Sequence, residues 1–266
     1  MNFSGIITTL IIMLVLGLFV GLFLGVAAIV FKVKVNEKEE AVLKALPGNN
    51  CGGCGFPGCA GLAAAIAKGE APVNQCPVGG EAVASEIAKI MGTEAGKSER
   101  QVAFVACKAH CDDITLDYDY TGSEDCRMLS FVPNGGPKSC NYGCLGYGSC
   151  VKVCPFGAIS VVDGVAVVNK ELCKACGKCV AVCPKHLISL IPYDAKYAVA
   201  CSNKEKGVVT TKQCKVGCIG CGICQKNCPK GAVSVTDFNA TIDYSLCANC
   251  GVCAEKCPKK SILNLG

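Results

Sequence analysis

Cysteines in regular groups dominate the chemistry that this sequence can perform. The chain has 266 residues, of which 25 are cysteine, and from residue 140 on, four cysteine groups end in a Cys-Pro pair, at Cys154, Cys183, Cys228 and Cys257. The run C-x2-C-x2-C-x3-C-P is the spacing of bacterial two-cluster ferredoxins, in which three close thiolates hold one four-iron cluster and the last thiolate holds the other. The sequence therefore predicts one-electron transfer through iron-sulfur clusters.

The clearest pair of motifs lies between residues 218 and 258. Each Cys-Pro cysteine is expected to serve the cluster of the other motif. The predicted ligand sets are Cys218, Cys221, Cys224 and Cys257 for one 4Fe-4S cluster, and Cys228, Cys247, Cys250 and Cys253 for the other. Segments 232–235 and 240–242 predict a β-hairpin. Zinc is the alternative for C-x2-C pairs, but zinc frameworks require neither the third cysteine nor the Cys-Pro.

A similar unit precedes this one, so the chain contains an internal duplication. Its regular ligand set is Cys154, Cys173, Cys176 and Cys179. The other set is irregular, because Tyr147 stands where the downstream copy has Cys221. We expect Cys140 to replace the missing ligand, which gives the set Cys140, Cys144, Cys150 and Cys183; a three-iron cluster without that ligand is the alternative.

A different cysteine spacing occurs nearer the N-terminus. Cys51, Cys54 and Cys59 lie in a glycine-rich loop, and Cys76 follows before a proline. Glycines let the backbone fold tightly round a cluster and donate N–H groups to its sulfurs. These four cysteines are expected to hold a further 4Fe-4S cluster, which brings the total to at least five. We predict helices over 36–46, 60–68 and 80–91 in the same region, the first capped by Asn36.

The remaining cysteines are Cys107, Cys111, Cys126, Cys201 and Cys214. A strand predicted over 100–107 runs into Cys107, and Cys107, Cys111, Cys126 and Cys140 could form a sixth cluster, but only if the irregular set gives up Cys140. His110 is either a ligand or an exposed loop histidine. Cys201 and Cys214 precede the second repeat much as Cys107 and Cys140 precede the first, either as ligands or as relics.

An uncharged segment, residues 6–31, precedes the cysteine-rich part and is longer than the ~20 apolar residues that span a bilayer. Its uncharged start and the lack of a small-residue cleavage site argue against a signal peptide. Lys32 and Lys34 follow it, so the cluster-binding part is expected on the cytoplasmic side of the inner or plasma membrane, where thiolates stay reduced. Gly17, Gly21 and Gly25 share one helix face and favour a membrane partner, although glycine is common in membrane helices.

The charge is uneven along the chain. Residues 140–266 contain 15 lysines and 7 acidic residues, a net +8, whereas residues 1–139 carry −3. An acidic protein partner explains this excess, and so does the charge of about −2 that each four-iron cluster carries with its thiolates. Basic charge without a nucleic-acid motif gives no reason to expect nucleic acid. No phosphate loop or G-x-G-x-x-G is present, and the two histidines form no general-base constellation, so no catalytic residue is predicted.

The predicted fold class is α+β, with a single N-terminal transmembrane helix, a small helical four-iron cluster domain and duplicated bacterial-type two-cluster ferredoxin-like domains. The predicted boundaries are 1–35 for the anchor, 36–92 for the four-iron cluster domain, 93–139 for a cysteine-containing connecting segment, and 140–200 and 201–266 for the two ferredoxin-like domains.

The order of anchor, CGGCGFPGCAG loop with Cys76 after it, and ferredoxin motifs resembles the B subunits of the Rnf complexes, the membrane-bound ion-translocating ferredoxin:NAD oxidoreductases. The resemblance covers essentially the whole chain. It implies that the protein accepts electrons from soluble reduced ferredoxin and passes them to other membrane and peripheral subunits that carry flavin and the NAD site. Membrane lipid is the further expected partner.

This chain departs from the shorter relatives, which have one ferredoxin region, by its second repeat and its extra cysteines.

Two other functions fit the motifs. One is an electron-conduit subunit of another membrane redox complex, hydrogenase-linked or quinone-linked. The other is a membrane-tethered iron-sulfur sensor, which would be expected to carry one labile cluster and an output domain.

Overall fold

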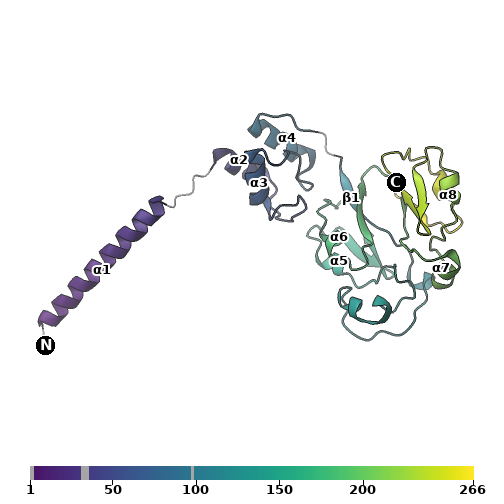
Figure 1. Cartoon of the computed structure of the whole chain (residues 1–266), viewed down its shortest axis with the longest axis horizontal. Coiled ribbons are helices and arrows are strands. Elements are labelled where there is room, and N and C mark those ends of the chain that lie inside the picture. Colours follow the sequence, from purple (N-terminus) through teal and green to yellow (C-terminus); the bar gives the residue numbers. More distant parts are fainter. Residues whose placement is uncertain (1–2, 31–35, 97–98) are drawn as a thin grey trace.

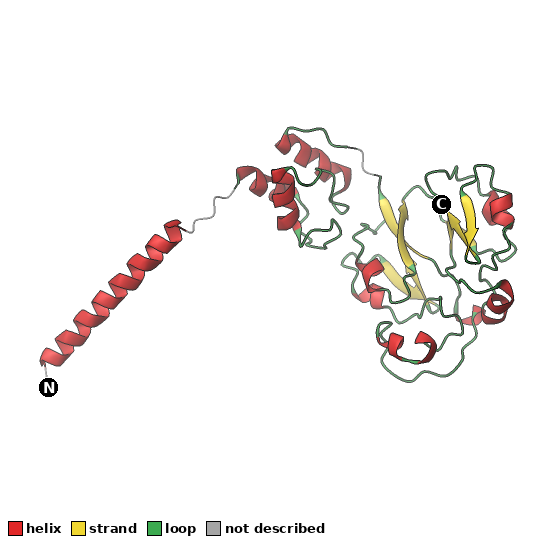
Figure 2. Cartoon of the chain, viewed as in Figure 1, coloured by secondary structure: helices red, strands yellow, loops and turns green. Residues whose placement is uncertain are grey.

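The computed structural model describes residues 3–30, 36–96 and 99–266 (Figures 1 and 2). Helix α1 (Phe3–Val30) is 28 residues long, which is about 42 Å at 1.5 Å per residue and exceeds the ~30 Å hydrocarbon core of a bilayer. No residue of its most apolar stretch, Leu10–Ala27, is buried within the chain. The predicted apolar helix is therefore confirmed as a candidate membrane span. Lys32 and Lys34, on which the expected sidedness depends, lie outside the described residues.

Three helices form a small domain after the anchor: α2 (Glu37–Ala45), α3 (Cys59–Lys68) and α4 (Gly80–Met91). The side-chain amide oxygen of Asn36 accepts the N–H of Lys38, so the predicted cap of α2 is confirmed. Val42, Leu62 and Ile87 are at most 1% exposed and make the core between the helices. All three predicted helices are confirmed, with ends shifted by one residue at most in α3 and α4.

The rest of the chain consists of short strands in antiparallel pairs and short helices. The strand pairs are β1 (Gln101–Val105) with β4 (Ile188–Pro192), β2 (Ile159–Val162) with β3 (Val165–Val168), β5 (Tyr197–Val199) with β8 (Ile262–Asn264), and β6 (Val233–Thr236) with β7 (Asn239–Ile242). The short helices are α5 (Ser149–Lys152), α6 (Lys178–Val182), α7 (Gly207–Gln213), α8 (Ile223–Lys226) and α9 (Val252–Glu255), with 3-10 turns at Cys111–Asp113, Met128–Phe131 and Pro133–Gly135. The predicted strand before Cys107 and the predicted hairpin β6–β7 are both confirmed.

The same pairing pattern occurs in both halves of this part. Each half has an internal hairpin, β2–β3 or β6–β7, whose two-residue turn lies in the left-handed region, at Asp163-Gly164 and at Asp237-Phe238. In each half, the strand after the last Cys-Pro pairs with a strand that precedes the first ferredoxin cysteine. The strand β1 thus ties the segment before residue 140 to the first half, and β5 pairs with the last strand of the chain.

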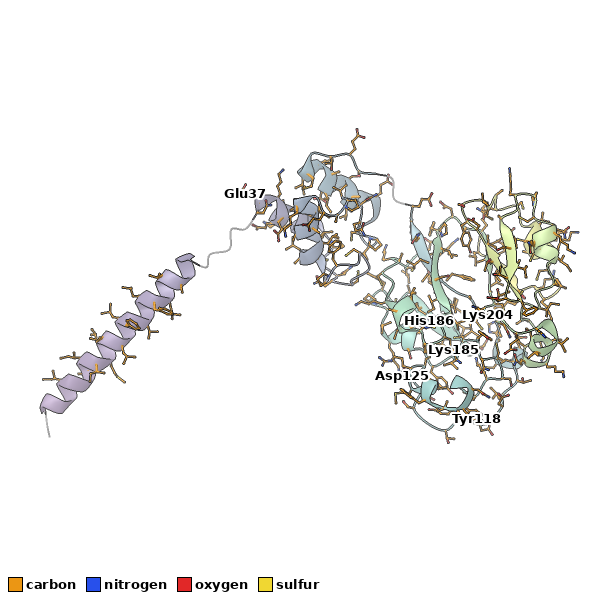
Figure 3. The ribbon with its side chains drawn as sticks, viewed as in Figure 1. Glu37, Tyr118, Asp125, Lys185, His186 and Lys204 are labelled. Atoms are coloured by element: carbon orange, nitrogen blue, oxygen red, sulfur yellow. The ribbon has the colours of Figure 1, made fainter. Side chains whose placement is uncertain are left out.

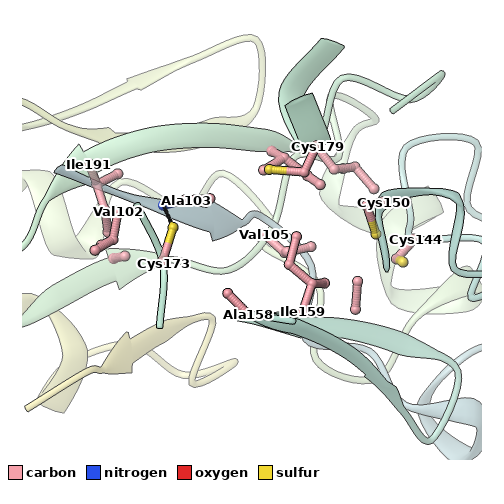
Figure 4. Packing of buried hydrophobic residues seen from close by; sticks show 14 of the residues in the cluster. Val102, Ala103, Val105, Cys144, Cys150, Ala158, Ile159, Cys173, Cys179 and Ile191 are labelled. Atoms are coloured by element: carbon pink, nitrogen blue, oxygen red, sulfur yellow. Dashed lines mark hydrogen bonds between the residues drawn. The ribbon is translucent and has the colours of Figure 1, made fainter. Parts of the chain in front are cut away.

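Cysteines and aliphatic residues share the core of the first half. Val105, Ile159 and Ile191 pack in one cluster with Cys173 and Cys179, among other residues (Figure 4). The corresponding cluster of the second half is smaller and also contains buried cysteines. Because the core of the second half is small, side-chain packing supplies only part of its stability, and we expect its cysteines to contribute through what they bind.

Shortening the core side chain Ile87 to alanine should destabilise the N-terminal helical domain. The side chain is fully buried, so Ile87→Ala is expected to cost about 2–5 kcal/mol locally, a factor of roughly 30 or more in the opening equilibrium. Amide hydrogen exchange of the full-length chain should therefore speed up in α2–α4 alone. Glu86→Ala changes an exposed neighbour on the same helix and should leave exchange unchanged. Equal exchange in the two variants would contradict the assigned core.

Candidate iron-sulfur sites

Two of the regular cysteine sets each surround one cavity. Cys218, Cys221, Cys224 and Cys257 line a cavity of about 380 Å³. Cys154, Cys173, Cys176 and Cys179 line one of about 310 Å³. The third cysteine of each motif lies in a one-turn helix, α8 or α6, that starts after a glycine in the left-handed conformation. That turn reverses the chain tightly enough for the thiols to converge.

Backbone N–H groups point at several of these sulfurs. The N–H of Ala103 on β1 donates to Cys173 Sγ at 3.3 Å (Figure 4), and that of Ser261 donates to Cys257 Sγ at 3.3 Å. Such bonds stabilise a negatively charged sulfur, and they help to set the reduction potential of a cluster that the sulfur binds.

The remaining regular set is Cys228, Cys247, Cys250 and Cys253. Burial, and then the nearby Cys247 and Cys250, raise the pKa of the Cys253 thiol. Cys228 packs in the same apolar cluster as Cys253. Cys250 is exposed, as is Cys221 in the neighbouring set, so the second half presents cysteines from both of its motifs to solvent.

The irregular cavity contains Cys126 in place of Cys140. Cys126, Cys144, Cys150 and Cys183 line a cavity of about 400 Å³, which Cys140 does not reach. Tyr147 does not line it either; its ring packs edge-on against Tyr120, with 6.0 Å between ring centroids. The long segment between β1 and α5 therefore brings a fourth thiol to the place that Tyr147 leaves without one.

A polar network holds Cys126 at this cavity. The Cys126 N–H donates to Ser149 Oγ at 2.9 Å, and the Ser149 hydroxyl donates to Asp125 Oδ1 at 2.8 Å. Figure 3 marks Asp125 on this loop. Hydrogen bonds from Arg127 hold the pKa of the Asp125 carboxyl well below its usual range. A lowered carboxyl pKa means that the network is intact at neutral pH and is lost only as the pH falls through that lowered value.

The N-terminal set lies on the loops around α3. Cys54, Cys59 and Cys76 pack against the apolar core of α2–α4. The Gly79 N–H donates to Cys76 Sγ at 3.4 Å, and Asn50 Oδ1 accepts the Cys59 N–H at 2.8 Å. Burial raises the pKa of the Cys76 thiol, and the nearby Cys51 and Cys54 add to the effect. All four predicted ligands therefore belong to one small region.

A further cavity, which the sequence did not predict, contains Cys107, Cys140, Cys201 and Cys214. The set Cys107, Cys111, Cys126 and Cys140 is not brought together, because Cys126 lies at another cavity and Cys111 is exposed. His110 lies with its Nδ1 3.9 Å from a carboxylate oxygen of Asp163 and does not line this cavity. The sequence did contain a signal for this set, because the run Val-Ala-Cys occurs twice, beginning at the last residue of β1 and at the last residue of β5.

No group of side chains suited to a single metal ion is found among the described residues. In the part of the chain that the structure describes, no three His, Cys, Asp or Glu side chains converge closely enough to hold one metal ion. Zinc would need such convergence, with bonds of about 2.3 Å to sulfur. Burial raises the pKa of Cys150 to about 12 and that of Cys224 to about 11. These thiols stay protonated at neutral pH unless iron displaces their protons.

The N-terminal domain touches the first half at a cysteine loop. A Cβ on Gly53 would lie 2.7 Å from the carbonyl oxygen of Cys176. The loop that carries Cys51 and Cys54 therefore meets the loop that carries Cys176 without an intervening side chain. Cys51 is also among the charged neighbours that, after burial, raise the pKa of Cys176.

Family models match the cysteine-rich parts of the chain. A model described as a putative Fe-S cluster matches residues 46–78, and models described as 4Fe-4S dicluster domains match residues 136–184, 172–232 and 217–261. The chain is therefore an iron-sulfur protein with several ferredoxin-type 4Fe-4S domains.

Curated relatives cover most of the chain. The B subunit of the Na(+)-translocating ferredoxin:NAD(+) oxidoreductase complex of Acetobacterium woodii is 44% identical over 223 residues, which is 84% of this chain and 67% of that protein. The B subunit of the ion-translocating oxidoreductase complex of Methanosarcina acetivorans is 45% identical over 84% of both chains. Its counterpart in the proton-translocating ferredoxin:NAD(+) oxidoreductase complex of Clostridium ljungdahlii is 43% identical over 82% of this chain and 77% of that protein.

Removing the Cys126 thiol should disturb one cluster. Cys126→Ala is expected to convert that cluster to a three-iron form or to lose it, because three thiols remain at its cavity. Iron analysis and the paramagnetic spectrum of the anaerobically purified full-length chain measure this change. Cys111→Ala is the matched control, since Cys111 is exposed and lines none of the four cysteine cavities. An unchanged iron count and spectrum in Cys126→Ala would show that the fourth ligand comes from elsewhere.

Proposed function

The chain belongs to the family of the B subunits of ion-translocating ferredoxin:NAD(+) oxidoreductase complexes, and we propose that it accepts electrons from reduced ferredoxin and passes them through at least five 4Fe-4S clusters to the flavin- and NAD-binding subunits of such a complex. The observation that carries this proposal is the series of four-cysteine cavities. The clusters, when bound, would supply the one-electron carriers. The protein positions them, and no residue of the chain is proposed to convert substrate.

We assign the ligands by the cavities that the cysteines line, and where no such cavity is described we assign them by their spacing and shared packing. Cys51, Cys54, Cys59 and Cys76 hold the N-terminal cluster, and the three regular sets of the ferredoxin motifs hold theirs as predicted. In the irregular set, Cys126 takes the place that spacing alone assigns to Cys140. The repeated strand pairing supports the view that the two halves are duplicated ferredoxin-like domains, each with an additional strand before its first cysteine.

The second half is the proposed docking surface for ferredoxin. Lys226, Lys230 and Lys260 are exposed there, close in sequence to the cysteine motifs. Among the described residues, the salt bridges involve Lys44, His110 and Arg127 and none of these lysines. Exposed Cys221 and Cys250 lie in the same half. Unpaired positive charge beside exposed cysteines suits an acidic electron donor.

The N-terminal domain is the proposed exit toward the membrane. The apolar helix α1 ends at Val30 and α2, the first helix of this domain, begins at Glu37, so the domain follows the anchor closely in sequence. The Gly53–Cys176 contact joins this domain to the first half. With α1 as a single-pass anchor and the clusters on the cytoplasmic side, electrons received at the second half would move toward membrane-bound subunits.

Electron delivery by ferredoxin should depend steeply on salt. Complementary charge mainly raises the association rate, and its reach falls to about 10 Å at 0.1 M salt. Stopped-flow reduction of the full-length chain by reduced ferredoxin should slow as salt rises, and Lys226→Glu with Lys230→Glu should slow it at low salt. Lys68→Glu with Lys89→Glu, two exposed positions in the N-terminal domain, is the charge-matched control.

Measuring the reduction potentials of the clusters in the lysine variants shows whether the lysines serve docking of ferredoxin or instead set the cluster potentials. If the lysines only balance cluster charge, the double variant would shift cluster potentials or lose iron, and the wild-type rate would not respond to salt. A rate that is independent of salt would remove the docking role.

Filling the contact at Gly53 should slow transfer between the N-terminal cluster and the first half. Gly53 has no left-handed φ, so Gly53→Ala strains no backbone, but its Cβ would overlap the Cys176 carbonyl and push the two loops apart. Rapid-freeze paramagnetic spectra after mixing with ferredoxin should show delayed reduction of the N-terminal cluster at unchanged iron content. Gly52→Ala strains the same loop, at φ 76°, without touching Cys176. Equal delays in the two variants would mean that loop strain, rather than the contact, is responsible.

A further inference from the structure

We propose that Cys107, Cys140, Cys201 and Cys214 hold an additional 4Fe-4S cluster between the two halves, with each half contributing two equivalent thiols. Its role in electron transfer rests on the proposed function, whereas the binding site itself does not. Six sets of four would use all but one of the 25 cysteines and leave Cys111 free.

Equivalent positions in the two halves supply the four thiols. Cys107 is the second residue after β1, which ends at Val105, and Cys201 is the second residue after β5, which ends at Val199. Cys140 lies four residues before Cys144, and Cys214 lies four residues before Cys218. The site is therefore built by the duplication itself, and neither half contains it alone.

Matching backbone contacts fix the strand-end cysteines. The N–H of Ala106 donates to the Leu187 carbonyl at 2.8 Å, and the N–H of Ala200 donates to the Ser261 carbonyl at 2.8 Å. These acceptors follow the last Cys-Pro of their respective halves, so each strand-end cysteine is tied to its own half.

The segment that carries Cys214 is tied across to the first half. The Lys215 N–H donates to the Asp113 carbonyl at 2.8 Å, and the Thr115 N–H donates to the Gln213 carbonyl at 3.1 Å. Cys214 is thereby held by backbone of the other half, and the four thiols meet where the halves join.

The cavity that results has the size of the regular ones. Its volume, counted with the space at its mouth that is open to solvent, is about 330 Å³, between the values of about 310 and 400 Å³ for the cavities that the ferredoxin cysteines line. Cys140 and Cys214 are buried. Cys107 and Cys214 lie close enough to Cys140 to add, after burial, to the rise in its thiol pKa.

Donors aimed at the sulfurs indicate a site built for thiolates. The Asn203 side chain is 1% exposed, and its Nδ2 lies 3.5 Å from Cys140 Sγ. The Cys218 N–H donates to Cys201 Sγ at 3.2 Å. An amide that donates to a buried sulfur favours the anionic form, which is the form that binds iron. On binding, the four thiols would release their protons to solvent.

The site would connect the clusters of the two halves. Cys218, a proposed ligand in the second half, donates its N–H directly to Cys201. On the other side, Cys140 and the proposed ligand Cys144 are joined by a single turn, in which the Gly143 N–H donates to the Cys140 carbonyl at 3.2 Å. One electron at a time could thus pass from a reduced cluster in one half to an oxidised cluster in the other.

Iron content of the anaerobically purified full-length chain tests the site without ferredoxin. We expect about 24 irons in the wild type. Cys201→Ala and Cys214→Ala should each lose about one to four irons, through a three-iron form or complete loss, and each should change the paramagnetic signals of one cluster. Cys111→Ala should match the wild type.

Asn203→Leu keeps all four thiols, so it tests the site even if the cysteine variants fail to fold. It should retain about 24 irons and shift the reduction potential of one cluster, because a donor to Cys140 Sγ is lost. A wild-type count of about 20 irons with no response to Cys201→Ala or Cys214→Ala, or one zinc per chain that Cys214→Ala removes, would overturn the proposal. Ferredoxin kinetics that fail to depend on salt would count against the docking role and leave this site standing.

Discussion

The structure depends on one requirement, that four thiols from separate segments converge on a common cavity. A thiol motif on a single tight loop supplies three ligands, and the fourth has to arrive from elsewhere in the chain. Cys257 closes the cavity of Cys218, Cys221 and Cys224 in this way, and Cys126 is brought to another cavity by a long loop. The strands, the one-turn helices and the left-handed turns are the means by which these distant cysteines meet.

The same requirement explains why the chain can fold with so little ordinary core. The apolar core of each half contains buried cysteines beside aliphatic side chains, and the core of the second half has only Val233, Ala240 and Ile262 beside its cysteines. Burial raises the pKa of Cys179 to about 11 and that of Cys201 to about 12, so the empty sites would hold neutral thiols. Iron binding and folding are therefore coupled, because ligation replaces four separate buried thiols with one cross-link between segments.

Contacts between the cavities give the chain a linear order. The N-terminal domain meets the first half at Gly53 and Cys176, and the first half meets the second around Cys140 and Cys201. At both junctions, a segment that carries cysteines lies directly against another segment that carries cysteines. An electron carrier benefits from such junctions, since bulky side chains between the sites would only lengthen the path. The apolar helix α1 precedes the N-terminal domain in the chain, and the second half stands at the other end of this order.

The sequence by itself determined the local features: the apolar helix, the helices over 60–68 and 80–91, the β6–β7 hairpin and the regular cysteine motifs. Each depends on residue spacing within a short segment, which the sequence displays directly. Only the tertiary structure decided how the irregular cysteines divide. Cys126 and Cys140 are both near Cys144 in sequence, and spacing favoured Cys140, but the Asp125–Ser149 network places Cys126 at the Cys150 cavity. Cys140 instead lines a cavity with Cys201 and Cys214, because antiparallel backbone pairing of residues 113–115 with residues 213–215 joins the two halves there. Long-range strand pairing leaves no mark in local spacing, and that is the physical reason why the sequence could not assign these thiols.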